Sequence, residues 1–420
     1  MRNTESAVKR EIEHTFRSLR YRNYRLYFTG QLLSLTGTWM QSVALSWLVY
    51  KMTRSPLLLG VVEGAHLLPV LFLGMAGGLV ADRADKKTVL ILAQLIAMAQ
   101  AITLAALTLT HHIEVWHCVA LALVLGTVNA FEVPSRQAFL PELVDRDDLV
   151  NAISLNSSLF NGARVLGPAL AGILVPFAGE GVCFLLNALS YTATLLAFVL
   201  INAKAPEPIE EQESSGGLLG GWRFVLEERT VLRLLLLGAV MSLLGMNYGV
   251  LMPVFASEIL HGDVRTLAVL RAGAGIGAFA AALALASRGT GERLKSGVGY
   301  ASMTFGSVLA CFAWSTNFWL SLALICMVGF AMTTQLSGGH SLVQLAVNDR
   351  VRGRVLSIYM TVMMGLAPLG SMVIGWAAGK WSAPPVVTFC GFACAAAGLL
   401  YTLVNRKVKT GSDDGDENLD

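Results

Sequence analysis

The sequence predicts an all-α integral membrane protein of twelve transmembrane helices, on three observations. Its 420 residues are 55% hydrophobic and only 14% charged, whereas soluble domains carry about 25% charged residues. The apolar stretches run to roughly twenty residues, the length that a helix needs to cross the hydrocarbon of a bilayer. Lys and Arg gather in alternate loops. Short alternating stretches, typical of barrel strands, are not seen.

The apolar stretches define the expected spans, which short polar loops separate. Their limits are 25–50, 56–80, 87–109, 115–137, 150–176, 180–202, 231–257, 265–287, 297–314, 317–340, 354–379 and 384–404. Residues 1–24 form a cytoplasmic N-terminal segment, and the acidic tail at 406–420 is expected to be disordered. The polar, basic N-terminus lacks the short apolar core of a cleavable signal.

Positive charge orients these spans, because cytoplasmic loops are enriched in Lys and Arg. When the N-terminus is placed in the cytoplasm, most of the 31 Lys and Arg residues fall on the inner side. The outer side then holds Lys51, Arg54, Arg265, Arg271 and Lys380. This bias predicts an even number of spans, with both termini in the cytoplasm.

The spans fall into two halves. A Pro-, Glu-, Ser- and Gly-rich break begins at Lys204, and such a composition is typical of a flexible linker. The expected domains are therefore a bundle at 25–203, a linker at 204–229 and a second bundle at 230–405. V-D-R-D-D-L-V-N-A-I-S-L at 144–155 is weakly echoed by V-N-D-R-V-R-G-R-V-L-S-I at 347–358. Two six-helix halves with a site near the midplane are a transporter plan.

The charged loop G-L-V-A-D-R-A-D-K-K, from Gly78 to Lys87, resembles the loop signature of the major facilitator superfamily. Asp85 stands where that pattern usually has glycine, and the sequence offers no physical reason for the difference. Four further stretches resemble the drug and siderophore exporter branch: 19–31, 133–144, 161–172 and 349–357. The resemblance implies the major facilitator fold, two pseudo-symmetric six-helix bundles around a cavity, with alternating access and proton-driven export.

The resemblance also implies that this loop is a conformational latch. Asp82 would meet the N-terminus of span eleven near Gly353, where free N–H groups and the helix dipole favour an anion. Arg83 would pair with Glu132. The latch residues are Gly78, Asp82, Arg83, Lys86, Lys87, Arg136 and Arg354. The alternative is a positive-inside anchor with incidental acidic residues.

Three ionisable residues inside spans are candidates for proton coupling. Glu63 and His66 are three residues apart, so they share one helix face. Ionisable groups within a membrane usually face a protein interior or a cavity, and a desolvated carboxylate can take up a proton there. Glu132, at the inner end of span four, is the third candidate. Glu63 is the favoured carrier, and its alternative role is a structural hydrogen bond with His66.

Arg164 lies near the middle of span five and needs a partner or a wet cavity. It either binds an anionic or catecholate substrate through forked hydrogen bonds or pairs with Glu63 or Glu132 as an internal strut. The other expected cavity residues are Asn156, Asn161, Asn247, Tyr248 and His340. Helix bending is expected at Gly167, Pro168, Gly172 and Pro368, although ordinary tight packing predicts the same residue types.

Motifs of enzymes are missing from the sequence. Neither H-E-x-x-H nor G-x-S-x-G occurs. All six cysteines lie in apolar runs, and the pair Cys390 and Cys394, four residues apart, has no accompanying His or carboxylate. We therefore expect no enzyme, metal or cofactor. The expected function is proton-coupled export of a siderophore or an amphipathic drug-like compound, by a monomer that contacts lipid and no nucleic acid. The alternatives are a transporter of lysophospholipids or other amphiphiles, and a membrane sensor that does not transport.

Overall fold

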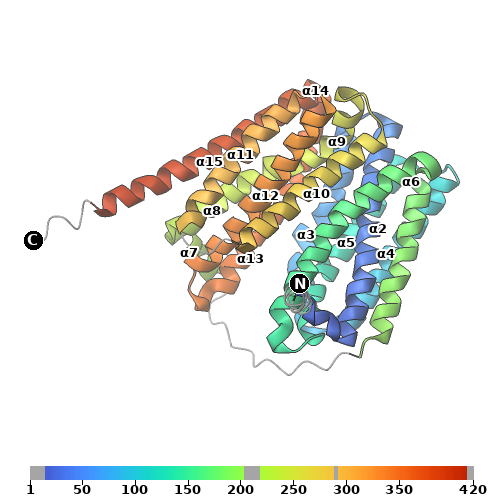
Figure 1. Cartoon of the computed structure of the whole chain (residues 1–420), viewed down its shortest axis with the longest axis horizontal. Helices are drawn as coiled ribbons and strands as arrows, with labels where there is room; N and C mark the ends of the chain where they lie inside the picture. The colour runs from blue at the N-terminus through green and yellow to red at the C-terminus, as the bar shows by residue number, and fades with distance from the viewer. Residues whose placement is uncertain (1–14, 203–217, 288–291, 414–420) are drawn as a thin grey trace, which may run out of the picture. The chain divides into compact units, whose positions relative to one another are not determined.

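The computed structural model describes residues 15–202, 218–287 and 292–413, and these residues contain helices and no strand (Figure 1). The predicted all-α membrane fold is confirmed. Most of the N-terminal segment, the Pro- and Glu-rich part of the linker and the end of the acidic tail lie outside the described residues. The last helix, however, continues into the predicted tail as far as Asp413, because a formed helix adds further residues at little cost.

The helices follow one another with short connections. Regular α-helices are α2 (Arg22–Thr53), α3 (Pro56–Arg83), α4 (Lys86–Leu109), α5 (Val115–Phe139), α6 (Leu149–Leu200), α7 (Leu218–Glu227), α8 (Arg229–Val240), α9 (Met252–Val254), α10 (Val264–Ser287), α11 (Glu292–Ala313), α12 (Phe318–Ala346), α13 (Asp349–Gly365), α14 (Ala367–Trp381) and α15 (Ala383–Asp413). Tighter or wider turns are η1 (Arg17–Arg20), η2 (Leu140–Glu142), η3 (Arg146–Asp148), η4 (Met241–Gly245), η5 (Met246–Leu251) and η6 (Phe255–Ile259).

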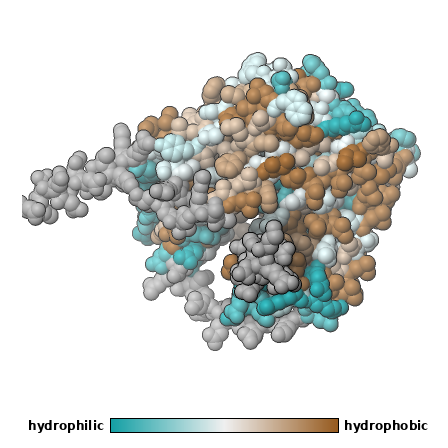
Figure 2. Space-filling view, in the orientation of Figure 1, coloured by the Kyte–Doolittle hydropathy of each residue, from teal (hydrophilic) through white to brown (hydrophobic). Residues whose placement is uncertain are grey.

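Among the described residues, 11 helical stretches are long and apolar enough to cross a membrane. The stretch from Arg146 to Leu200 holds two of the expected spans, five and six. They are separated at Gly179, whose φ of 80° lies in the region that glycine adopts without steric cost. Large apolar side chains cover the flanks of the helices (Figure 2), and examples are Phe72, Phe177 and Trp319, which are 71%, 80% and 74% exposed. A surface so apolar fits contact with lipid.

The chain forms two compact units. The first, here the N-unit, comprises Met1–Leu48 and Leu68–Gln212. The second, the C-unit, comprises Val49–Leu67 and Glu213–Asp420. The C-unit therefore includes the turn between α2 and α3. Tyr50, in the last turn of α2, donates a hydrogen bond to Glu258 of η6, and Arg54 of the turn donates one to Ser257, 2.9 Å away.

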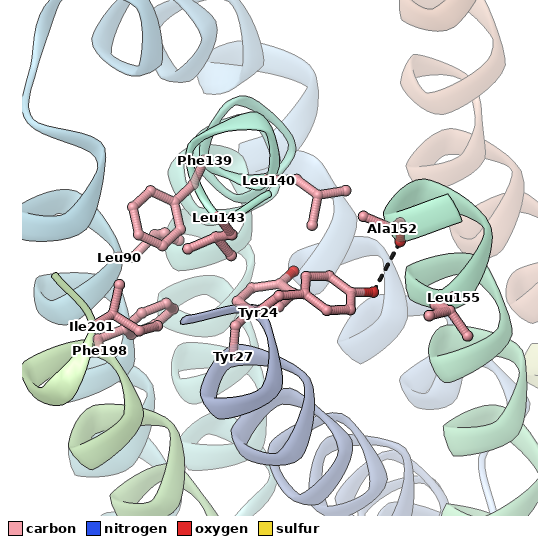
Figure 3. Close-up of a cluster of buried hydrophobic side chains, with 10 residues drawn as sticks. All are labelled: Tyr24, Tyr27, Leu90, Phe139, Leu140, Leu143, Ala152, Leu155, Phe198 and Ile201. Carbon is pink, nitrogen blue, oxygen red and sulfur yellow. Dashed lines mark hydrogen bonds between the residues drawn. The ribbon is translucent and has the colours of Figure 1, made fainter. Parts of the chain in front are cut away.

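The helices of the N-unit meet in an aromatic core near the ends of α2, α4, α5 and α6. Its buried members are Tyr24, Tyr27, Leu90, Phe139, Leu140, Leu143, Ala152, Leu155, Phe198 and Ile201 (Figure 3). The hydroxyl of Tyr24 donates to the backbone oxygen of Ala152, 2.9 Å away, so this aromatic side chain buries its ring without leaving its polar atom unpaired.

A group of ion pairs and hydrogen bonds joins η1 to the start of α6. Asp148, whose side chain is 4% exposed, forms an ion pair with Arg17 Nε at 2.9 Å and accepts hydrogen bonds from Arg20 Nη2 at 2.6 Å and the Tyr21 hydroxyl at 2.8 Å. Asn151 Oδ1 accepts from the Ser18 hydroxyl at 2.7 Å. Two of the stretches that the sequence analysis singled out, at 19–31 and 144–155, therefore bind each other at their ends.

Asp85 begins α4. Its backbone is extended, with φ −62° and ψ 108°, and its carboxylate accepts from the backbone N–H of Thr88 at 3.0 Å and from the Thr88 hydroxyl. These two hydrogen bonds lower the pKa of Asp85, because they stabilise the charged form. Aspartate and glycine are both favoured at helix N-caps, which supplies the physical reason for the departure from the family pattern.

Replacing Asp85 with alanine should lower the unfolding free energy by about 1 kcal/mol, the usual cost of losing an N-cap, whereas Asp85→Asn should retain most of it. Thermal unfolding of the purified protein in detergent measures both. The folded pKa is lowered, so the charged cap stabilises the fold above the unfolded pKa and this part is lost as pH falls through the folded value. Equal melting temperatures for the alanine variant and the wild type at neutral pH would rule out the cap.

Candidate substrate and proton sites

An arginine and two aromatic rings form a polar-aromatic surface between α2 and α6 of the N-unit. The rings of Trp39 and Phe160 meet edge to face, with centroids 5.9 Å apart. Arg164 Cζ lies 5.7 Å from the centre of the Trp39 ring. Phe160 and Arg164 share a helix face because they are four residues apart. We call these three residues the Trp39 surface.

Among the described residues of the N-unit, Arg164 makes no ion pair, and its contact is with Trp39. Glu132, one of the two expected partners, pairs with Arg136 instead. A guanidinium over an aromatic face is attracted by the ring quadrupole, and its hydrogen-bond donors are left for another group. This geometry suits an anionic or aromatic ligand.

Gly167 allows α6 to approach α2 at the Trp39 surface. A Cβ atom at this position would overlap Trp39 Cβ and would lie 2.8 Å from the backbone nitrogen of Met40. Gly162, about one and a half turns earlier, has no heavy atom within 4 Å of the place that a Cβ would take. α6 remains helical through Pro168 and is non-helical only at Gly179.

The other two polar candidates of α6 are already hydrogen-bonded. Asn156 Oδ1 accepts from the hydroxyl of Tyr27 at 3.1 Å, which ties α6 to α2. Asn161 Nδ2 donates to the backbone oxygen of Ser157 at 2.9 Å, within its own helix.

A buried polar cluster lies where α5 meets α2 and α4. Glu132 Oε1 accepts from Arg136 Nη1 at 3.4 Å and from Gln94 Nε2 at 3.2 Å. Arg136 Nη1 also donates to Gln31 Oε1 at 3.3 Å. The side chains of Glu132 and Arg136 are 12% and 14% exposed, and both glutamines are 1% exposed. We call these four residues the Glu132 cluster.

Glu63 and His66 lie on α3 in the part that belongs to the C-unit, and both are half-buried. Within the described ranges, Glu63 has no hydrogen bond or ion pair. The helix is tightly packed beside it, because a Cβ at Gly64 would lie 2.9 Å from the side chain of Met372. Glu63 is therefore a lone carboxylate, whereas Glu132 has a counter-ion.

Span seven is irregular where Asn247 and Tyr248 lie. The π-turn η4 is followed by the 3₁₀ turn η5, and Asn247 Nδ2 donates to the backbone oxygens of Ser242 and Leu243 at 2.8 and 3.1 Å. The ring of Tyr248 packs edge to face against Phe305, with centroids 6.1 Å apart. Asn247 thus stabilises the irregular backbone, which is a role that the sequence did not indicate.

His340 lies beside Tyr359 of α13, with ring centroids 6.5 Å apart. Gly339 leaves space for the Tyr359 hydroxyl, since a Cβ there would lie 2.7 Å from it. Span eleven is interrupted at Leu366 between α13 and α14, and Pro368 stands in the first turn of α14.

The loop between α3 and α4 is held by its lysines. Lys86 Nζ pairs with Glu142 Oε1 at 2.8 Å, and Lys87 Nζ donates to the backbone oxygen of Ile201 at 2.7 Å. Asp82 and Arg83 are exposed. The predicted pair of Arg83 with Glu132 is not formed, because Glu132 binds Arg136, one turn further along its own helix.

Gly78 and Arg354 are two further residues of the expected latch. Gly78 has no heavy atom within 4 Å of the place that a Cβ would take, so contacts do not demand glycine there. Arg354 is half-buried on α13 of the C-unit.

Long apolar helices and an apolar exterior define a multi-pass membrane protein. Residues 13–417 match the model of a family described as transmembrane secretion effector, and the chain belongs to this family of the major facilitator superfamily. It is 25% identical over 391 residues to the staphyloferrin A transporter of Staphylococcus aureus, covering 92% of this chain and 97% of that protein. It is also 25% identical over 388 residues to the enterobactin exporter EntS of Citrobacter koseri, covering 91% of each.

Solved structures share the fold. A bacterial homologue of the lysosomal transporter Spinster, in an inward-facing and occupied conformation, superposes with a TM-score of 0.73 at 13% identity, covering 92% of this chain and 97% of that one. A bacterial homologue of the iron transporter ferroportin, in an inward-facing state, gives a TM-score of 0.66 at 16% identity, covering 92% and 98%.

Substituting alanine for Gly167 should destabilise the protein by about 1–3 kcal/mol, because the new methyl group overpacks the crossing of α6 with α2. The matched variant Gly162→Ala has open space and should be neutral or slightly stabilising, since alanine favours helix more than glycine. Thermal unfolding in detergent compares them. A Gly167→Ala protein as stable as Gly162→Ala would contradict the tight crossing.

Proposed function

We propose that the protein is a proton-coupled exporter of a siderophore, working by alternating access in the bacterial inner membrane with both termini in the cytoplasm. The Trp39 surface is the observation that carries the proposal. It offers a cation that has no carboxylate partner among the described residues of the N-unit, beside two aromatic rings, and this suits a ligand that combines negative charge with aromatic or apolar groups. The names of the two relatives, a staphyloferrin A transporter and an enterobactin exporter, support this substrate class.

The orientation in the membrane and the energy source of the proposed exporter are inferred from its charged residues. Lys and Arg on the inner side of the spans support cytoplasmic termini. The proton gradient supplies the energy, and Glu63, His66 and Glu132 are the candidates to exchange protons. The exporter is a monomer in contact with membrane lipid. A lysophospholipid or another amphiphile is the competing cargo, and a sensor without transport is the competing role.

Export is tested in cells that synthesise enterobactin or staphyloferrin A and lack their own exporter. Expression of the wild type should increase the secreted siderophore, as measured by mass spectrometry of the medium, and a protonophore should reduce the increase. Arg164→Gln, which removes the cation, should lower secretion of the same compound at least tenfold, whereas Arg164→Lys should retain part of it. If neither siderophore is secreted and labelled lysophospholipid is moved instead, the siderophore is not the cargo and a lysophospholipid takes its place.

The latch at the loop between α3 and α4 is part of the proposal. Asp82 is exposed at the end of α3 and is free to meet a helix N-terminus, a contact worth about 0.3–1 kcal/mol, which is enough to bias an equilibrium between two conformations. Asp82→Asn should therefore impair export while the protein level in the membrane stays normal. Asp85→Asn, which removes one charge from the same loop but keeps the cap, is the matched control. Full export by Asp82→Asn would eliminate the latch.

A further inference from the structure

The first half of span five, at the start of α6, exposes polar side chains within an apolar stretch. Ser154, Ser157 and Ser158 are exposed, and Asn161 and Arg164 are half-buried. With 3.6 residues per turn, these five side chains share about one third of the helix circumference. They extend over about 15 Å along the axis, at 1.5 Å per residue. We call these five residues the α6 polar face.

The second half of the same span has a different surface. Between Leu166 and Phe177 every exposed side chain is apolar, and Leu166, Ile173 and Phe177 are 50%, 58% and 80% exposed. Such a surface suits lipid, whereas strongly polar side chains within a membrane usually face a protein interior or a water-filled cavity. The exposed surface of span five therefore changes from polar to apolar at Arg164.

The other side of this helical segment is fixed to α2. The Tyr24 hydroxyl donates to the backbone oxygen of Ala152 at 2.9 Å, and one turn later the Tyr27 hydroxyl donates to Asn156 Oδ1 at 3.1 Å. Leu159, on the same side, is 3% exposed. These contacts set the rotation of the helix about its own axis. The serines of the α6 polar face are consequently turned away from the core of the N-unit.

The hydrogen-bonding groups of the α6 polar face are ordered along the helix. The hydroxyls of Ser154 and Ser158 donate to backbone oxygens of their own helix at 2.9 and 3.0 Å, so each offers only its lone pairs to another molecule. Asn161 uses one N–H on the backbone of Ser157 and keeps a second N–H. Arg164 has donors only. Acceptors therefore lie toward the start of α6, and donors lie toward Arg164.

We propose that the α6 polar face binds a hydrophilic anion lengthwise. The anionic group of the ligand lies at Arg164, and its hydroxyl or amide N–H groups donate to Ser158 and Ser154, about 9–15 Å away along the helix. This inference rests on the proposed function and names the class of its substrate. Arg164 supplies the charge complementarity, because it has no carboxylate partner among the described residues of the N-unit.

A lysophospholipid does not fit this surface. Its acyl chain would cover the hydroxyls and the Asn161 amide without offering them hydrogen bonds, and a polar group that loses water without gaining a partner costs free energy. The order of donors and acceptors thus favours a siderophore over an amphiphile as the cargo.

Thiol labelling tests the α6 polar face without the cargo. Single substitutions Ser157→Cys and Asn161→Cys are compared with Leu166→Cys and Ile173→Cys in the full-length protein in membrane vesicles. A sulfonate-bearing methanethiosulfonate is the reagent, and peptide mass spectrometry reads each site apart from the native cysteines. The first two sites should react at least about tenfold faster, because a thiol in apolar surroundings does not ionise readily. Equal rates in the two halves overturn the inference.

The charge of the reagent tests the end at Arg164. At Asn161→Cys the sulfonate reagent should react faster than its trimethylammonium counterpart, and Arg164→Gln should reduce that ratio several-fold, because the cation concentrates anions nearby. The ratio at Ser154→Cys should change little, since about 15 Å exceeds the Debye length of about 8 Å at physiological ionic strength. A ratio at Asn161→Cys that ignores Arg164→Gln overturns the anion site.

Protection from labelling identifies the ligand class, and secretion separates this inference from the proposed function. Enterobactin or staphyloferrin A should slow labelling at Ser157→Cys, and a lysophospholipid should not; protection by the lysophospholipid alone overturns the hydrophilic class. A wild type that secretes neither siderophore but keeps the labelling contrast and its dependence on Arg164 removes the named cargo alone. Undiminished siderophore secretion by the double variant Ser157→Leu and Asn161→Leu removes the α6 polar face alone.

Discussion

The hydrocarbon interior of a bilayer supplies no hydrogen bonds, and this constraint shapes the protein. Backbone groups must be paired within the chain, so the spans are helices. Where span seven departs from regular α-helix, the amide of Asn247 takes up two of the carbonyl groups concerned. Charged side chains within the spans also need partners from the protein itself. Glu132 and Arg136 are surrounded by Gln31 and Gln94, each from another helix, because lipid would not solvate them.

Helices in lipid gain little from the hydrophobic effect when they associate, so close packing must hold them together. Gly167 lies against Trp39, and Gly77 of α3 lies against the backbone oxygen of Ala130. Such crossings fix the distance between helices, and the positions of polar side chains follow from that distance. Arg164 reaches the ring of Trp39 because Gly167, nearly one turn away, brings the two backbones together.

The sequence predicted the spans well, because their length and their flanking charges are local properties. The N-cap of α4 was also within reach, since Asp85 and Thr88 have the spacing of a cap. The residues that pair with the charged side chains were harder to predict from the sequence. Arg136 was available as the neighbour of Glu132 one turn away, yet Arg83 was favoured from the family pattern. The burial of Gln31 and Gln94, and the binding of Asp148 to Arg17 and Arg20, depend on which helices pack together, and no local signal carries that information.

Arg136 and Arg164 of the N-unit differ in the groups that balance their charge. Arg136 has a carboxylate and an amide, whereas Arg164 has an aromatic face and no carboxylate among the described residues. A cation without a counter-ion is costly inside a membrane, so an anionic ligand that reaches Arg164 recovers part of that cost.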